Sequence, residues 1–149
     1  MIAKPNQAGT SPETSAAPPL VLVVDDFTDG RELTVEILTV AGMRVIEARD
    51  GLQALDAAFS SRPDAIVLDL ALPGMNGWEV ARRLKQDART RAIPVVALTA
   101  HAIQAYRKSA LDAGCDAFLT KPCPPKALLR EVERVLAAAL EPHRLRSEA

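Results

Sequence analysis

Five short apolar runs, each followed by a stretch with helical periodicity, constrain the fold of this chain more than any other feature. The runs cover residues 20–24, 43–47, 64–69, 93–98 and 115–119. Runs of this length that are rich in Val, Ile and Leu are typical of buried strands. Because strands alternate strictly with helices, the pattern predicts a parallel sheet with helices on both of its faces. The more polar run at residues 43–47 is expected at an edge of that sheet.

Capping patterns indicate where the intervening helices begin. In a capping box, a side chain at the helix start accepts a hydrogen bond from the backbone three residues further on. Three pairs have this spacing: Asp29 with Glu32, Asp50 with Gln53, and Asn76 with Glu79. The first helix is expected to end at Gly42. A fourth helix is expected at about 103–113, and a fifth at about 125–140, where apolar residues recur at helical spacing.

The predicted fold is therefore α/β, a doubly wound, flavodoxin-like sheet of five parallel strands in the order 2-1-3-4-5. Right-handed crossovers leave few other arrangements. A chain of 149 residues suits one domain, which we expect at residues 20–140. We expect residues 1–19 to form a disordered N-terminal tail and residues 141–149 a C-terminal tail, with no appended output domain.

Composition excludes several functional classes. The net charge is −1 and aromatic residues make up 3%, so neither a basic face nor a stacking surface for nucleic acid is indicated. No apolar stretch approaches the length that spans a bilayer, so we expect no membrane partner. The chain has two cysteines and no apolar run near its N-terminus, which favours a reduced, cytoplasmic setting.

Polar residues stand where four of the five predicted strands end. Asp25 and Asp26 follow the first run, Asp69 ends the third, Thr99 follows the fourth and Lys121 follows the fifth. Open α/β sheets bind ligands at the carboxyl ends of their strands, and the predicted order makes the first and third strands neighbours. Crowded carboxylates repel one another unless a cation intervenes, and carboxylate oxygens suit Mg²⁺. We therefore expect Asp25, Asp26 and Asp69 to bind Mg²⁺.

The same strand ends suit phosphoryl transfer. The backbone carbonyl of Ala71, in the turn after Asp69, is a further candidate Mg²⁺ ligand. Asp69 is the candidate nucleophile, as carboxylates are in enzymes that form aspartyl phosphate. Lys121 can pair with one phosphoryl oxygen and Thr99 can donate a hydrogen bond to another. The predicted catalytic residues are therefore Asp69, Lys121 and Thr99.

The pattern resembles the receiver domain of two-component response regulators. The resemblance covers about residues 20–140 and rests on Asp25-Asp26, the turn from Asp69 to Gly77, Thr99-Ala100 and Lys121-Pro122. It implies that Asp69 accepts a phosphoryl group from a phosphohistidine of a histidine kinase or a histidine phosphotransfer protein. It also implies that Asp26 and Asp69 bind Mg²⁺ directly, that Asp25 does so through water, and that the Lys121–Pro122 bond is cis.

The resemblance further implies a switch. Phosphorylation would draw the Thr99 hydroxyl toward the phosphoryl group, and Phe118 would turn inward. This would alter the surface of the fourth helix, fifth strand and fifth helix, where a downstream protein would bind. Because Phe118 lacks a hydroxyl group, we expect a bias toward its inward rotamer. Ala71 and His101 flank the path of a hydrolytic water in the family, and the direction of their effect on phosphoryl lifetime stays open.

The leading functional interpretation is a free-standing phosphoacceptor switch that is not a conventional enzyme, although it promotes its own Mg²⁺-dependent phosphorylation and dephosphorylation. The alternative is a phosphorelay carrier, or the receiver domain of a hybrid histidine kinase. A Mg²⁺-dependent hydrolase with an aspartyl nucleophile would need a general acid near Asp69, such as an aspartate two residues after it. Ala71 stands at that position, which disfavours the hydrolase.

Overall fold

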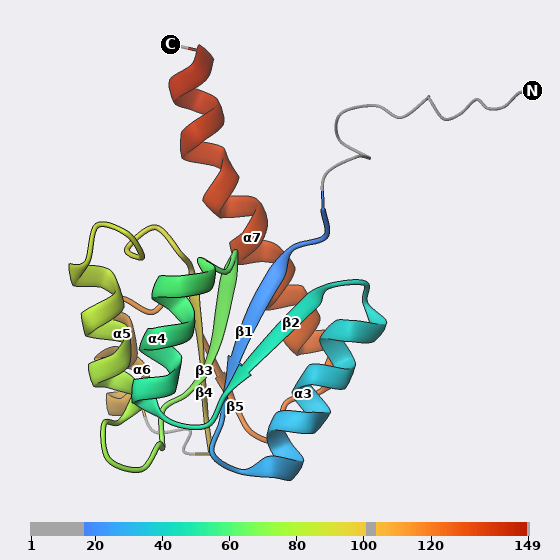
Figure 1. Cartoon of the computed structure of the whole chain (residues 1–149), viewed down its shortest axis with the longest axis vertical. Helices are drawn as coiled ribbons and strands as arrows, with labels where there is room; N and C mark the ends of the chain where they lie inside the picture. The colour runs from blue at the N-terminus through green and yellow to red at the C-terminus, as the bar shows by residue number, and fades with distance from the viewer. Residues whose placement is uncertain (1–16, 101–103, 149) are drawn as a thin grey trace, which may run out of the picture.

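A parallel sheet forms the centre of the molecule (Figure 1). The computed structural model describes residues 17–100 and 104–148, with side chains described as far as residue 140. Within these residues the sheet has five strands in the order β2-β1-β3-β4-β5, and every neighbouring pair is parallel. The strands are β1 (Leu20–Val24), β2 (Arg44–Ala48), β3 (Ala65–Asp69), β4 (Val95–Thr99) and β5 (Ala117–Thr120). The predicted topology is confirmed.

Helices cover both faces of the sheet (Figure 1). They are α3 (Thr28–Val40), α4 (Gly51–Ser61), α5 (Gly77–Gln86), α6 (Gln104–Asp112) and α7 (Pro125–Glu148). The first core lies under α4, α5 and α6 and includes Leu22, Ile66, Leu68, Val80 and Leu84. The second core lies under α3 and α7 and includes Val21, Val67, Leu38, Val132 and Val135. Successive strand residues alternate between the two cores, which explains the unbroken apolar runs.

The polar run at residues 43–47, predicted at an edge of the sheet, corresponds to the edge strand β2. β2 is paired on one side with β1, and its residues Arg44 and Glu47 are exposed. The central strands β3 and β4 are buried along their whole length. The degree of polarity along each run therefore indicated its place in the sheet.

Two of the three predicted capping boxes have the expected hydrogen bond, and one prediction is wrong. The Asp50 side chain accepts from the Gln53 N–H at 2.8 Å, and the Asn76 side chain accepts from the Glu79 N–H at 3.0 Å. Asp29 is not a cap, because α3 begins one residue earlier and Asp29 lies in its first turn. The residue before α3 is Phe27, which offers no side-chain acceptor.

Several predicted boundaries also shift. β4 begins at Val95 rather than residue 93, and β5 at Ala117 rather than residue 115. The backbone carbonyls of Pro18 and Pro19 accept hydrogen bonds from Arg44, so these two residues belong to the edge of the domain rather than to a tail.

The α7 helix continues to Glu148, past the end expected near residue 140, and projects beyond the sheet (Figure 1). The predicted helix start at 103 lies outside the described residues, and so do residues 1–16 of the predicted tail.

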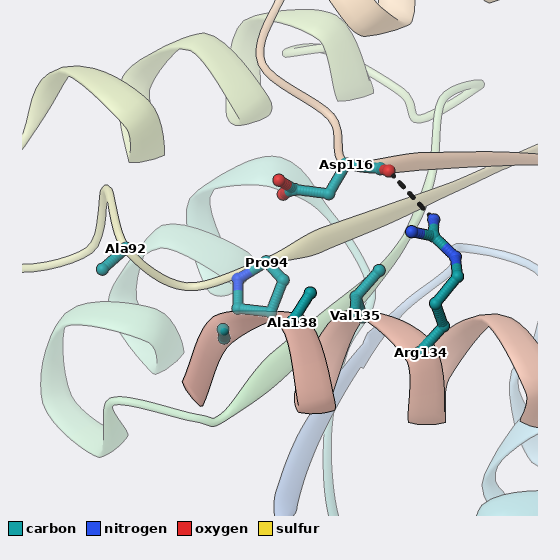
Figure 2. Close-up of a pocket in the computed structure, with 7 residues that line it drawn as sticks. Ala92, Pro94, Asp116, Arg134, Val135 and Ala138 are labelled. Atoms are coloured by element: carbon teal, nitrogen blue, oxygen red, sulfur yellow. Dashed lines mark hydrogen bonds between the residues drawn. The ribbon is translucent and has the colours of Figure 1, made fainter. Parts of the chain in front are cut away.

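A pocket lies near the residues that precede β4 and β5 (Figure 2). One carboxylate oxygen of Asp116, Oδ2, accepts from Lys85 Nζ at 3.1 Å and from the Val95 N–H at 2.8 Å. Arg134 donates to its backbone carbonyl at 3.3 Å. Lys85 also donates to the Ile93 carbonyl at 2.8 Å. These bonds tie α5, α7 and the beginnings of two strands together, at the end of the sheet opposite the acidic residues.

No helix within residues 17–100 and 104–148 has both the length and the apolar character needed to cross a bilayer.

Candidate acidic site at the carboxyl edge of the sheet

Three carboxylates meet at the carboxyl ends of β1 and β3. Asp25 and Asp26 directly follow β1, and Asp69 is the last residue of β3. One oxygen atom from each residue lies within 4.8 Å of the other two. Asp25 and Asp69 are buried, with 3% and 6% of their surfaces exposed, whereas Asp26 is exposed. The fold thus brings together the three predicted acidic residues, because β1 and β3 are neighbours in the sheet.

The Lys121 side chain bridges the two buried carboxylates. Its Nζ atom donates to Asp25 Oδ2 at 3.0 Å and to Asp69 Oδ2 at 2.9 Å. The Lys121 N–H donates to the Thr99 carbonyl at 2.7 Å, which continues the pairing of β4 and β5 past their ends. The Lys121–Pro122 peptide bond is cis, as the resemblance implied. Residues from β1, β3 and the end of β5 therefore converge on one point.

The other oxygen of each buried carboxylate is held by the loop that follows it. Asp69 Oδ1 accepts from the Ala71 N–H at 2.9 Å. Asp25 Oδ1 accepts from the Phe27 N–H at 2.9 Å. Each carboxylate therefore has one oxygen bonded to its own loop and one to Lys121. This arrangement holds both side chains in a single orientation.

Burial and charge shift the pKa values of the central pair. Burial raises the pKa of Asp69 above its ordinary value, and hydrogen bonds from Lys121 and Ala71 only partly oppose this effect. The nearby Asp25 charge adds to the increase. Burial lowers the pKa of Lys121, but its hydrogen bonds to Asp69 and Asp25 outweigh that effect, so the net shift is upward. Among the described side chains of the cluster, three carboxylates face one ammonium group, so a divalent cation would be attracted there.

The turn after β3 packs closely against the Asp69 backbone. Gly77, the first residue of α5, donates its N–H to the Leu70 carbonyl at 3.0 Å. A Cβ atom at Gly77 would lie 2.6 Å from the Asp69 carbonyl oxygen and 2.6 Å from Leu70 Cα. No ordinary side chain fits such a gap between backbone atoms. Glycine is therefore required for α5 to begin where it does.

The predicted switch residues lie on the two strands next to this site. Thr99 ends β4 and is buried. Phe118 in β5 is half-buried, packs against the first core and has the Arg107 guanidinium carbon 5.9 Å from its ring centroid. The predicted inward bias of Phe118 stays a prediction. Ala71 is exposed, and His101 lies outside the described residues.

Sequence reasoning missed Arg31. This residue is buried on α3, and its Nη1 atom donates to the Asp25 carbonyl at 3.0 Å. A signal was present: Arg31, Thr34 and Leu38 form the buried stripe of α3 at helical spacing, and a charged residue on such a stripe needs a partner.

The sheet order, the acidic cluster and the bridging lysine define a class, the receiver domains of two-component signalling. The family model for the response regulator receiver domain matches residues 21–133. The chain belongs to this family of signalling domains.

Individual relatives resemble this chain over most of its length. It is 34% identical over 122 residues to the polar-differentiation response regulator DivK of Brucella anthropi, covering 82% of this chain and 99% of DivK. It is 39% identical over 116 residues to the phosphate regulon transcriptional regulatory protein PhoB of Pseudomonas aeruginosa, covering 78% of this chain and 51% of PhoB. The chain thus spans about half the length of PhoB.

A solved structure shows a metal ion in a comparable domain. The receiver domain of the sensor histidine kinase PA1611 from Pseudomonas aeruginosa has a magnesium ion coordinated in its active site cleft. It matches this chain with a TM-score of 0.76 and 33% sequence identity, covering 81% of this chain and 99% of that domain.

Proposed function

We propose that this protein is a single-domain response regulator that accepts a phosphoryl group on Asp69. The donor is a phosphohistidine of a histidine kinase or of a histidine phosphotransfer protein. The observation that carries the proposal is the Lys121 ammonium group, which lies 2.9 Å from the Asp69 carboxylate at an open end of the sheet. The similarity along 99% of DivK, a polar-differentiation response regulator, supports a response-regulator role.

The residues of the site have complementary roles in this reaction. An Asp69 carboxylate oxygen attacks the phosphorus atom, the phosphorus–nitrogen bond breaks, and the histidine leaves with its electron pair. Lys121 pairs with a phosphoryl oxygen, which requires that its ammonium group leave the two carboxylates. The Thr99 hydroxyl donates to another phosphoryl oxygen. The Ala71 N–H holds Asp69 Oδ1, which leaves Oδ2 as the oxygen exchanged between Lys121 and the phosphoryl group.

The donor set fits Mg²⁺. Oxygen atoms of Asp25, Asp26 and Asp69 lie within 4.8 Å of one another, and hard divalent cations prefer such ligands. Asp26 and Asp69 would bind the ion directly, Asp25 through water, and the Ala71 carbonyl would add a further ligand. When bound, Mg²⁺ would neutralise the charge that gathers on the phosphoryl oxygens. The magnesium ion in the PA1611 receiver domain supports this assignment.

Phosphorylation then changes a protein-binding surface. Thr99 moves toward the phosphoryl group, Phe118 turns inward, and the surface of α6, β5 and α7 changes for a downstream partner. We place this signalling in the cytoplasm, without nucleic acid or membrane as a partner. The half-buried position of Phe118 between the first core and Arg107 supports its part in the switch.

A second candidate is a phosphorelay carrier or the receiver domain of a hybrid kinase. The similarity to the receiver domain of the sensor histidine kinase PA1611 favours it. Rapid return of the phosphoryl group from Asp69 to a phosphotransfer histidine would indicate a carrier. A partner that binds only the phosphorylated form would indicate a switch.

Phosphotransfer profiling tests the acceptor. Radiolabelled kinases from the source organism are mixed with wild-type protein, Asp69→Asn and Asp56→Asn, each with Mg²⁺ or with EDTA. Asp56 is an exposed carboxylate on α4 and serves as the matched control. Wild type and Asp56→Asn should take up label with Mg²⁺ only, and Asp69→Asn should take up none. Equal labelling of Asp69→Asn would show that another residue is the acceptor.

A further inference from the structure

We propose that Arg31 is a positioning residue for the metal site. Its guanidinium group holds the peptide that joins Asp25 to Asp26, and thereby fixes the backbone position from which the Asp26 side chain reaches the metal. This inference rests on the proposed function, because it takes the acidic cluster to be a Mg²⁺ site.

Asp25 is bonded at each of its polar groups, and Arg31 supplies one of these bonds. The Asp25 N–H donates to the Ala48 carbonyl at 3.1 Å. Its two carboxylate oxygens accept from the Phe27 N–H and from Lys121. Its backbone carbonyl accepts from Arg31 Nη1 at 3.0 Å. Without Arg31, this buried carbonyl would have no hydrogen-bond donor among the described residues.

Arg31 is itself held between two elements that provide no metal ligand. It lies on α3, and 8% of its surface is exposed. Its Nε atom donates to Glu47 Oε1 on β2 at 2.9 Å. The planar guanidinium group carries several donors in a fixed geometry, so it bonds Glu47 and the Asp25 carbonyl together. Lysine, with a single charged nitrogen on a flexible stem, cannot reproduce this geometry.

The Asp25 carbonyl that Arg31 holds belongs to the peptide that leads into Asp26, the exposed candidate ligand. A peptide group is planar, so fixing the Asp25 oxygen also fixes the N–H of Asp26 and the entry of the chain into that residue. Asp26 is exposed, and no hydrogen bond from another described residue holds its carboxylate. The position of the Asp26 carboxylate therefore depends on the backbone that precedes it, and Arg31 holds that backbone.

Whether replacement of Arg31 weakens or strengthens Mg²⁺ binding distinguishes a positioning role from an effect of its positive charge. The positive charge of Arg31 repels Mg²⁺, so removal of the charge alone would strengthen binding. Loss of the bond to the Asp25 carbonyl would weaken it, because partners that orient metal ligands typically contribute about 10- to 100-fold in metal affinity. The two explanations thus predict opposite changes for Arg31→Met.

The experiment measures the Mg²⁺ dissociation constant of the full chain by amide chemical shifts, for wild type, Arg31→Met, Arg31→Lys and Thr90→Ala. Thr90 is the control for general destabilisation. It is buried, and its hydroxyl donates to the Leu84 carbonyl at 2.7 Å, at the end of α5. Urea unfolding without Mg²⁺ gives the stability of each variant.

We expect the dissociation constant to rise about tenfold or more in Arg31→Met, to rise less in Arg31→Lys, and to stay unchanged in Thr90→Ala. An unchanged or lower value in Arg31→Met would overturn the proposal, and so would an equal rise in Thr90→Ala. If Arg31→Met does not fold, Arg31→Lys decides, because an unchanged value there contradicts positioning. Wild-type protein that does not bind Mg²⁺ would contradict the proposed function itself.

Discussion

Replacing Gly77 by alanine should disturb the proposed phosphoacceptor, Asp69, more than it disturbs the fold. The new Cβ atom would lie 2.6 Å from the Asp69 carbonyl oxygen and 2.6 Å from Leu70 Cα. Ordinary contacts between such atoms are about 3.5 Å, so α5 and the end of β3 must separate by roughly 1 Å. Overpacking of this kind typically costs about 1–3 kcal/mol in the free energy of unfolding. A misplacement of that size at a reacting group can lower a rate by about 100-fold.

Val80→Ala provides the matched control. Val80 lies on the same helix and is completely buried in the first core. Its truncation should cost a similar roughly 1–3 kcal/mol through a cavity, without a collision against the Asp69 backbone. Urea unfolding measures stability, and the initial rate of phosphoryl uptake from a labelled kinase measures function. Gly77→Ala should be slow and Val80→Ala close to wild type. Equal rates in the two variants would refute the reasoning.

Two further predictions concern a thiol and an ammonium group. Burial raises the pKa of Cys115 from 9.0 to about 12, so folding favours the protonated thiol and this contribution is lost as pH rises from about 9 to 12. Between pH 8 and pH 10.5 the free energy of unfolding of the wild type should therefore fall by about 2 kcal/mol more than that of Cys115→Ala. Urea unfolding from pH 8 upward measures both, and an equal pH dependence in the two proteins would contradict this. Lys121→Met should bind Mg²⁺ more tightly, because no ammonium group competes for Asp25 and Asp69, yet accept phosphoryl groups about 100-fold more slowly. Amide shifts and label uptake measure the two effects, and weaker Mg²⁺ binding would contradict the first.

The sheet and the assembly of the site followed from the sequence because both depend on strand order. The runs that became β1, β3 and β4 are apolar along their length, and those strands occupy the middle of the sheet. Once β1 and β3 are neighbours, the residues at their carboxyl ends must meet. The convergence of Asp25, Asp26 and Asp69 required no knowledge of side-chain packing.

The errors arose where backbone bonding, rather than a pattern of side chains, decides the local structure. Asp29 has the spacing of a capping residue, but the loop before α3 is held by Asp25, whose carboxylate accepts from the Phe27 N–H. The end of α7 was placed where its apolar stripe stops, and a helix backbone can continue past the residues that it buries. Arg31 was missed because its partner is a backbone carbonyl, which no side-chain motif reveals.

The bonds around Asp116 give the sheet an asymmetry between its two ends. Lys85 and the Val95 N–H fasten the beginnings of β4 and β5 to each other and to α5. The opposite ends of these strands carry Thr99 and lead into Lys121, the residues that respond to a phosphoryl group in the proposed reaction. A displacement that begins at Thr99 would therefore be expected to decrease along β4 toward Val95, where these bonds hold the strand.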